Sequence, residues 1–341
     1  MVDLCLTIGV SRAEHLPELP GAITAAHEMS EWAKQSGFIT EMITDEGNNS
    51  VTIARIREKL LSMLPENDEV NLFILHFAGH GFRTGAEQNV WLPTDWYQEM
   101  RAISVEGLKR QLYRHGIKNL SIFSDACRTL PGDIENADIA EDPILPRGPY
   151  EPTPPIIDRF NAVMDGKQAY MLQGDNQSPP RCIFSSVLIE GLCGLHEDAF
   201  DEYIPDCVIP ESLALFSQKR MKQIGNLYRL TCTPDSSTGI PRQHTIYFER
   251  GRQLLGNIID LRWPAPPESY NKNTNEDSHS EWSNEDSDDI PDEYFSSPDE
   301  HYSSPDSYND KEYFDIPLFL SKTEENEKKS KASRIISIHN I

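Results

Sequence analysis

The chain has 341 residues, a formal net charge of −24 and a hydrophobic content of 38%, which suffices for one large α/β domain with additional segments. No apolar run reaches 18 residues, and the first residues, MVDLCL, lack the basic and long apolar regions of a signal peptide. These features exclude a membrane-spanning chain and predict a cytoplasmic protein without a membrane partner. The six cysteines form no C-x-x-C pair, which argues against a disulfide framework and a zinc site.

Short apolar runs alternate with helical patterns along the first 125 residues. The runs typical of buried strands are residues 4–10, 39–43, 70–77 and 120–123. Apolar residues recur at helical spacing in residues 22–36, 53–64 and 105–115. Such alternation predicts an α/β fold with a mostly parallel central sheet flanked by helices.

The pattern breaks after residue 130. Residues 131–166 are rich in proline and acids and predict a linker. Regular structure is expected to resume with a strand at 168–172, helices at 183–195 and 213–224, and further elements at 228–231 and 244–248.

The last part of the chain carries half of its net charge, because residues 267–341 hold 19 acidic and 7 basic residues. Residues 294–300, YFSSPDE, are echoed by YSSPDS at 302–307 in a stretch too polar to bury a core. We expect residues 256–341 to form an acidic, largely disordered tail, which is either a solvating segment or a segment that docks a partner or inhibits the enzyme. The acidity argues against nucleic acid as a partner, since phosphates would be repelled.

Two motifs follow neighbouring apolar runs: Gly79-His80-Gly81 and Asp125-Ala126-Cys127-Arg128. Open parallel sheets present their functional residues beyond the carboxyl ends of the strands, where both His80 and Cys127 would lie. An imidazole that takes the proton of a thiol turns the cysteine into a nucleophile. His76 lies on the strand before His80 and has a structural role in this interpretation. Since that segment is a strand, its HxxxH spacing is not a metalloprotease helix.

Five segments in order resemble the caspase, paracaspase and metacaspase superfamily of cysteine peptidases. They are residues 19–26 (LPGAITAA), 72–81 (LFILHFAGHG), 91–95 (WLPTD), 120–127 (LSIFSDAC) and 183–191 (IFSSVLIEG). The resemblance implies a caspase-like fold with a large-subunit-like half at 1–130, an intersubunit linker at 131–166 and a small-subunit-like half at 167–255. It also implies protein substrates.

The resemblance assigns roles to individual residues. His80 would be the base and Cys127 the nucleophile, and the backbone N–H groups of Gly81 and Cys127 would form the oxyanion hole. Water is the second substrate, so no cofactor and no metal site are expected. A need for Ca²⁺ stays open, because metacaspases commonly use it and residues 175–177 (DNQ) match their acidic loop only in part. An activated Cys127 should react with alkylating reagents ahead of the other cysteines.

Specificity is expected to depend on two carboxylates. Asp125 stands where caspases that cut after Asp have other groups, and it predicts a pocket for Arg or Lys at P1, the substrate residue before the scissile bond. Asp175 follows the next strand and would form a second wall. An acid that lines the pocket in metacaspases is missing, because Thr24-Ala25 replaces their Asn-Asp.

Processing of the linker is expected to activate the enzyme. Arg147 and Arg159 would be cleavage sites in an exposed loop. The enzyme itself or an upstream activating protease would make the cut, or a regulator would control it. Related bacterial proteins suggest a stress or antiviral defence pathway. The alternative is a catalytically silent caspase-like scaffold that docks partners through its acidic tail.

Overall fold

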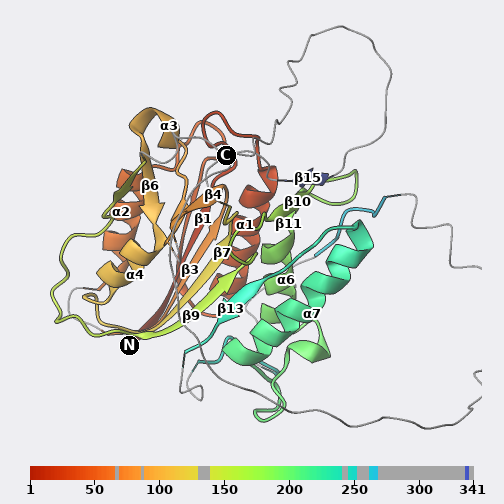
Figure 1. The fold of residues 1–341 in the computed structure, drawn as a ribbon. Coiled ribbons are helices and arrows are strands. Elements are labelled where there is room, and N and C mark those ends of the chain that lie inside the picture. The colour runs from red at the N-terminus through yellow and green to blue at the C-terminus, as the bar shows by residue number, and fades with distance from the viewer. Residues whose placement is uncertain are drawn as a thin grey trace, which may run out of the picture. The chain divides into compact units, whose positions relative to one another are not determined.

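A six-stranded sheet forms the centre of the structure (Figure 1), with the strand order β13-β9-β7-β3-β1-β2. The computed structural model describes residues 1–65, 69–85, 88–129, 139–239, 245–251, 261–267 and 335–337. The strands of the sheet are β1 (Val2–Gly9), β2 (Ile39–Thr44), β3 (Val70–Ala78), β7 (Ile117–Asp125), β9 (Ile156–Asn161) and β13 (Asp235–Ser237). All neighbours pair in parallel except β13, which is antiparallel to β9. The mostly parallel sheet predicted from the alternating pattern is confirmed.

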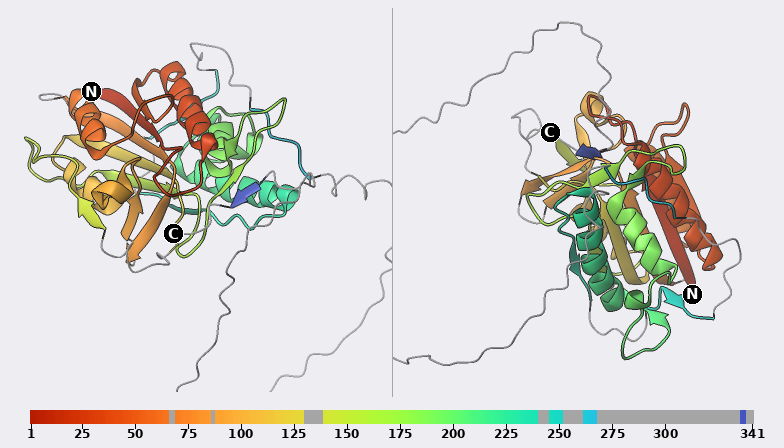
Figure 2. Two further views of the ribbon diagram at one scale, coloured as in Figure 1. Left: turned by 90° about the horizontal axis from the view of Figure 1, so that it is seen from above. Right: turned by 90° about the vertical axis from the view of Figure 1, so that its right-hand side faces the viewer.

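Helices cover both faces of this sheet. They are α1 (Pro20–Gln35), α2 (Ile53–Met63), α3 (Trp96–Glu99), α4 (Val105–Leu112), α6 (Ile183–Leu192) and α7 (Pro210–Tyr228), with a 3-10 turn, η1 (Glu197–Ala199). The right-hand view of Figure 2 shows α1, α6 and α7 side by side on one face. Among the described residues, no helix has the length and apolar character needed to cross a membrane.

Alternating side chains of the strands divide the core into two clusters, because successive residues of a strand point to opposite faces. Leu4, Leu6 and Ile8 pack with buried residues of α2 and α4. Cys5 between them packs with α1, α6 and α7. The near-continuous apolar runs read in the sequence therefore mark strands that are buried on both faces.

A second, four-stranded sheet that the sequence did not suggest lies after β3. Its order is β4-β5-β6-β8, with β4 (Gly81–Gly85), β5 (Gln88–Trp91), β6 (Arg101–Ser104) and β8 (Ala140–Asp142). These strands are three to five residues long, too short to show a reliable alternation. Their pairing depends on contacts distant in sequence.

A three-stranded sheet and a two-stranded sheet complete the second half of the chain. β10 (Tyr170–Leu172) lies between β11 (Arg181–Cys182) and β15 (Ile335–Ser337). β12 (Cys207–Val208) pairs with β14 (Phe248–Glu249). All the described residues belong to one compact unit made of residues 1–270 and 333–341.

Several expected boundaries are wrong. The stretch 131–166 is not a linker throughout, since it contains β8 and β9. Residues 228–231 are not a separate element, because Tyr228 ends α7. His244, part of the element expected at 244–248, and most of the acidic tail expected at 256–341 lie outside the described residues.

Candidate active site

His80 and Cys127 occupy equivalent places beyond two neighbouring strands. β3 and β7 pair in parallel with Ala78 opposite Asp125, and each candidate lies two residues further along its chain. The backbone N–H of Gly79 donates to the Asp125 carbonyl at 3.1 Å, and the N–H of Arg83 donates to the Thr129 carbonyl at 2.8 Å. The two segments that carry His80 and Cys127 are therefore joined on both sides of these residues.

The close approach of these segments explains the glycine after His80. A Cβ atom at Gly81 would lie 2.7 Å from the Val90 carbonyl oxygen and 3.0 Å from the Ala126 Cβ. It would also lie 3.4 Å from the carbonyl oxygen of Cys127. Only a residue without a side chain fits here unless the backbone moves.

A backbone carbonyl sets the tautomer of His80. The imidazole Nε2 lies 2.8 Å from the carbonyl oxygen of Pro17, which can only accept, so Nε2 carries the proton in the neutral ring. Within the described residues, the buried Nδ1 has no hydrogen-bond partner. Burial lowers the pKa of His80 below its ordinary 6.5, and only the Pro17 contact opposes this shift. The ring is thus a neutral base with one unused lone pair.

Cys127 is a buried thiol in this structure. Its exposed fraction is 4%, against 1% for His80, and the amide N–H of Ala169 donates to its Sγ at 3.3 Å. Burial raises the pKa of Cys127 to about 12, although the Ala169 contact lowers it. Because burial disfavours the thiolate, we do not expect Cys127 to be alkylated ahead of the other cysteines while the site is closed.

The carboxylate of Asp125 is buried and joined to the start of α6. Its Oδ2 accepts from the Ser185 N–H at 2.7 Å and from the Ser185 hydroxyl at 2.8 Å. That hydroxyl oxygen lies 3.0 Å from Nε2 of His76, so the imidazole donates to it. Burial raises the pKa of Asp125 to about 6, with the two Ser185 bonds opposing the shift. The structural role expected for His76 takes the form of a buried His76–Ser185–Asp125 chain.

Asp175 is engaged by backbone groups. Its Oδ1 accepts from the N–H groups of Gln177 and Ser178 at 2.9 Å, and its Oδ2 accepts from the N–H of Ala265 at 2.9 Å. The carboxylate therefore holds a turn against residues 261–267. Its role as a wall of a substrate pocket stays a prediction.

The two expected cleavage sites differ in their surroundings. Arg147 is exposed in an irregular segment. Arg159 is not in a loop, because it belongs to β9 and pairs with Ile122 of β7 and Ser237 of β13. The proline-rich composition around 131–155 hid the short strand that follows it.

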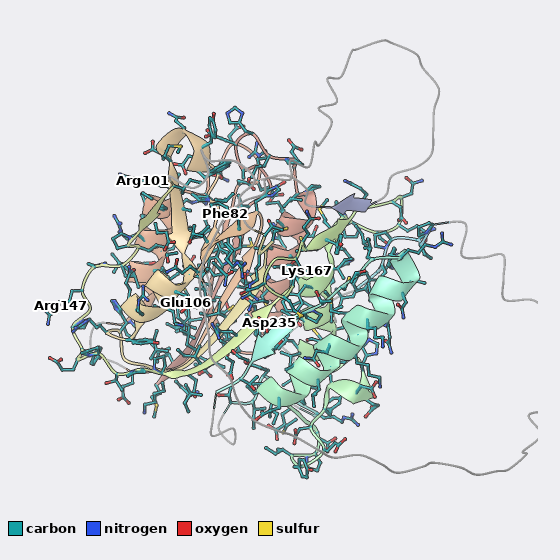
Figure 3. All side chains as sticks on the ribbon, viewed as in Figure 1. Phe82, Arg101, Glu106, Arg147, Lys167 and Asp235 are labelled. Carbon is teal, nitrogen blue, oxygen red and sulfur yellow. The ribbon has the colours of Figure 1, made fainter. Side chains whose placement is uncertain are left out.

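Arg128 is a site residue whose role the sequence did not indicate. Its guanidinium donates to the Val163 carbonyl at 3.0 Å and to Asp235 at 2.6 Å, and it also pairs with Asp165. Its backbone N–H donates to the Lys167 carbonyl at 3.0 Å. Lys167 and Asp235, which both contact Arg128, are labelled in Figure 3. Arg128 thus fixes residues 163–167, which precede the Ala169 amide that contacts Cys127.

Pro17, Ala169 and Ser185 were also missed. Pro17 and Ala169 act through backbone groups, which any residue type could supply, so no sequence signal marks them. Ser185 belongs to a segment that the sequence did single out, residues 183–191, but only as a helix.

Comparisons with known proteins identify the family of the chain. The model of the caspase-domain family, Peptidase_C14, matches residues 2–293. A crystal structure of protein GSU0716 from Geobacter sulfurreducens is similar over 73% of this chain and 97% of its own, with 14% identity and a TM-score of 0.48. A search of the curated proteins finds no match. Since the family match spans most of the sequence and the sheet has the expected architecture, the chain belongs to the caspase-domain family of cysteine peptidases.

Proposed function

We propose that this protein is an active cysteine endopeptidase in which His80 is the base and Cys127 the nucleophile. The orientation of His80 carries the proposal. Nε2 carries the ring proton and donates a hydrogen bond to the Pro17 carbonyl. The other ring nitrogen, Nδ1, is therefore left to accept a proton. Cys127 stands at the matching position beyond the adjacent strand.

The chemistry follows from this arrangement. As a substrate carbonyl approaches, Nδ1 takes the thiol proton and Sγ forms a bond to the carbonyl carbon. The imidazolium then returns the proton to the leaving amine, which leaves an acyl-enzyme, and water hydrolyses that thioester with His80 again as the base. Because the resting thiol has its pKa raised to about 12 by burial, proton transfer and attack should be coupled. The N–H groups of Gly81 and Cys127 are proposed to stabilise the oxyanion.

For specificity, we propose a basic P1 residue. Asp125 lies two residues before the nucleophile, and both of its hydrogen bonds with Ser185 are accepted by Oδ2. The other oxygen, Oδ1, is the one that we propose a cationic side chain would bind. Asp175 would contribute as a second wall only if substrate displaces one of its backbone partners. The reaction requires water and no cofactor, and Ca²⁺ is not assigned a role.

A panel of fluorogenic peptides that differ only at P1 tests this proposal. We expect hydrolysis of the Arg and Lys peptides and none of the Asp peptide above the level of Cys127→Ala, since a buried carboxylate repels a like charge. Turnover of the Asp peptide at the rate of the Arg peptide would refute the basic pocket.

The buried dyad also favours a second candidate, the silent scaffold, because neither side chain is open to solvent. The same panel, run on wild type that has been cut at Arg147, decides between them, since a scaffold then still gives the signal of Cys127→Ala with every peptide.

Activation by cleavage is proposed at Arg147 alone. This residue is exposed, and Figure 3 shows it at the outer edge of the structure, on the side of β6 and α4 and well away from Lys167. The separation favours cleavage by a second molecule or by an upstream protease rather than within one chain. We further propose that the enzyme works in the cytoplasm, a reducing compartment, because none of its six cysteines, all of which the structure describes, forms a disulfide. A stress or defence pathway is proposed from the family resemblance.

Replacing Arg147 by alanine should keep the chain intact and its activity low, whereas the wild type gains activity as it is cut. Mass spectrometry of active samples identifies the cut, and Arg114→Ala provides a control at another basic surface position. Full activity of an uncut Arg147→Ala protein would show that processing at this site is not the switch.

A further inference from the structure

One edge of β10 is paired with the far end of the chain. Tyr170, Met171 and Leu172 lie opposite Ser337, Ile336 and Ile335 of β15, and the two strands are antiparallel. The other edge of β10 pairs with β11. Figure 1 shows β15 beside β10 and β11, although about 160 residues of sequence separate β10 from β15.

One end of β10 lies next in sequence to a residue that contacts the nucleophile. Ala169, whose amide donates to Sγ of Cys127, comes directly before Tyr170, the first residue of β10. The end of the ladder nearest the thiol is therefore the pair Tyr170–Ser337. Read from Ile335 to Ser337, β15 runs toward that end.

A peptide that adds to this edge in the same direction would advance its carboxyl-terminal side toward Cys127. Pairing of an extended peptide with an open strand supplies backbone hydrogen bonds whatever the side chains, and pockets then select among sequences. The edge of β10 thus has the polarity needed to present a peptide bond to the thiol.

The site beside this edge is closed. His80 and Cys127 are almost fully buried in the structure that contains β15. Residues 335–341 (IISIHNI) contain no Lys or Arg. Under the basic P1 preference proposed above, this segment would bind without being cut.

We propose that β15 is an intramolecular inhibitor, which covers the outer edge of β10 and keeps other extended peptides from pairing there. The part concerning substrates rests on the proposed peptidase function. The ladder spans only three residue pairs, so a substrate or a partner that captures the C-terminal segment can displace it.

Proline substitutions in the full chain test the pairing. Alternate residues of a strand donate toward a given neighbour, so either Ile335 or Ile336 carries an N–H that faces β10. Proline removes that donor, and Ile335→Pro and Ile336→Pro are made separately. Ser321→Pro is the matched control, because it places a proline elsewhere in the same tail.

Two readouts do not require peptidase activity. The first is the rate at which iodoacetamide alkylates Cys127. Mass spectrometry measures this rate, with Cys207 as the internal reference. The second is hydrogen exchange of the amides of residues 170–172. At least one proline variant should raise both rates about tenfold or more, and the Ser321→Pro control should match wild type. Circular dichroism checks that the variants remain folded.

Adding the edge strand back provides the reciprocal test. A synthetic peptide of residues 335–341 should slow alkylation of Cys127 in the released variant, and the same peptide with proline in place of Ile336 should not. If both proline variants and the control give wild-type alkylation and exchange, the inference is overturned. If the rates rise but no variant cleaves any peptide, the inhibitory strand stands and the proposed peptidase function fails.

Discussion

Replacing Cys127 or His80 by alanine should remove peptide hydrolysis almost completely, with a loss of at least about a thousandfold in kcat/KM, or ~4 kcal/mol of transition-state stabilisation. Without Cys127 no acyl-enzyme forms. Without His80 the thiol keeps its proton, because burial raises its pKa to about 12. The double variant should lose little more than either single one, since the two residues act as a unit.

The pH dependence offers a check on His80. Burial lowers its pKa from the ordinary 6.5, so the ring stays neutral and able to accept a proton at pH values below 6.5. We expect kcat/KM to hold through neutral pH and to fall only on the acidic side of 6.5, where both His80 and Asp125, whose pKa burial raises to about 6, become protonated. In Asp125→Asn only the part of this fall that belongs to His80 should remain. Stopped-rate assays with an Arg peptide from pH 4 to 8 measure this profile.

Cys207→Ala and His27→Ala are the matched controls. Cys207 belongs to β12, and His27 pairs with Glu46 on an exposed surface, so both should retain wild-type kcat/KM. Activity within tenfold of wild type in folded Cys127→Ala would rule out this residue as the nucleophile.

Replacing Asp125 by asparagine should separate specificity from stability. The carbonyl oxygen of asparagine can still accept from the Ser185 N–H, whereas the charge that would bind a basic P1 side chain is lost. A desolvated charge-assisted contact contributes roughly 2–4 kcal/mol, so kcat/KM for the Arg peptide should fall by about thirtyfold to a thousandfold. Alanine is a poorer test because it leaves the Ser185 N–H without its acceptor.

The stability of Asp125→Asn at neutral pH should not fall with its activity. Burial raises the pKa of Asp125 from 3.8 to about 6, so the folded state disfavours the carboxylate. This group contributes most to stability below pH 3.8, and the contribution is lost as pH rises through about 6. The difference is about 3 kcal/mol at neutral pH by linkage. Asp125→Asn should therefore be at least as stable as wild type at pH 7.5, with a smaller difference at pH 4.

Urea unfolding of both proteins at pH 4 and pH 7.5 measures this shift, and peptide assays on the same samples measure specificity. A variant that is less stable than wild type at pH 7.5 would show that the charged carboxylate supports the fold through Ser185. An unchanged Arg preference would remove Asp125 from the substrate pocket.

The sequence alone predicted four of the six strands of the central sheet, β1, β2, β3 and β7, and proposed His80 and Cys127 as the dyad. β1, β3 and β7 are buried on both faces, so their apolar runs are unambiguous, and the motifs that follow them carry side chains with one evident chemistry. The expected helix ends were close, for example Pro20–Gln35 against residues 22–36, because apolar spacing reports the buried face of a helix.

Only the tertiary structure decided the state of the site. The tautomer of His80 depends on a carbonyl 63 residues earlier in the chain, and the contact to Cys127 comes from an amide 42 residues later. Backbone groups carry no sequence signature. Arg159 was misplaced because the proline-rich stretch before it hid the six-residue strand β9. The pairing of β10 with β15 was not foreseen, because strands as short as three residues are defined by distant partners rather than by their own pattern.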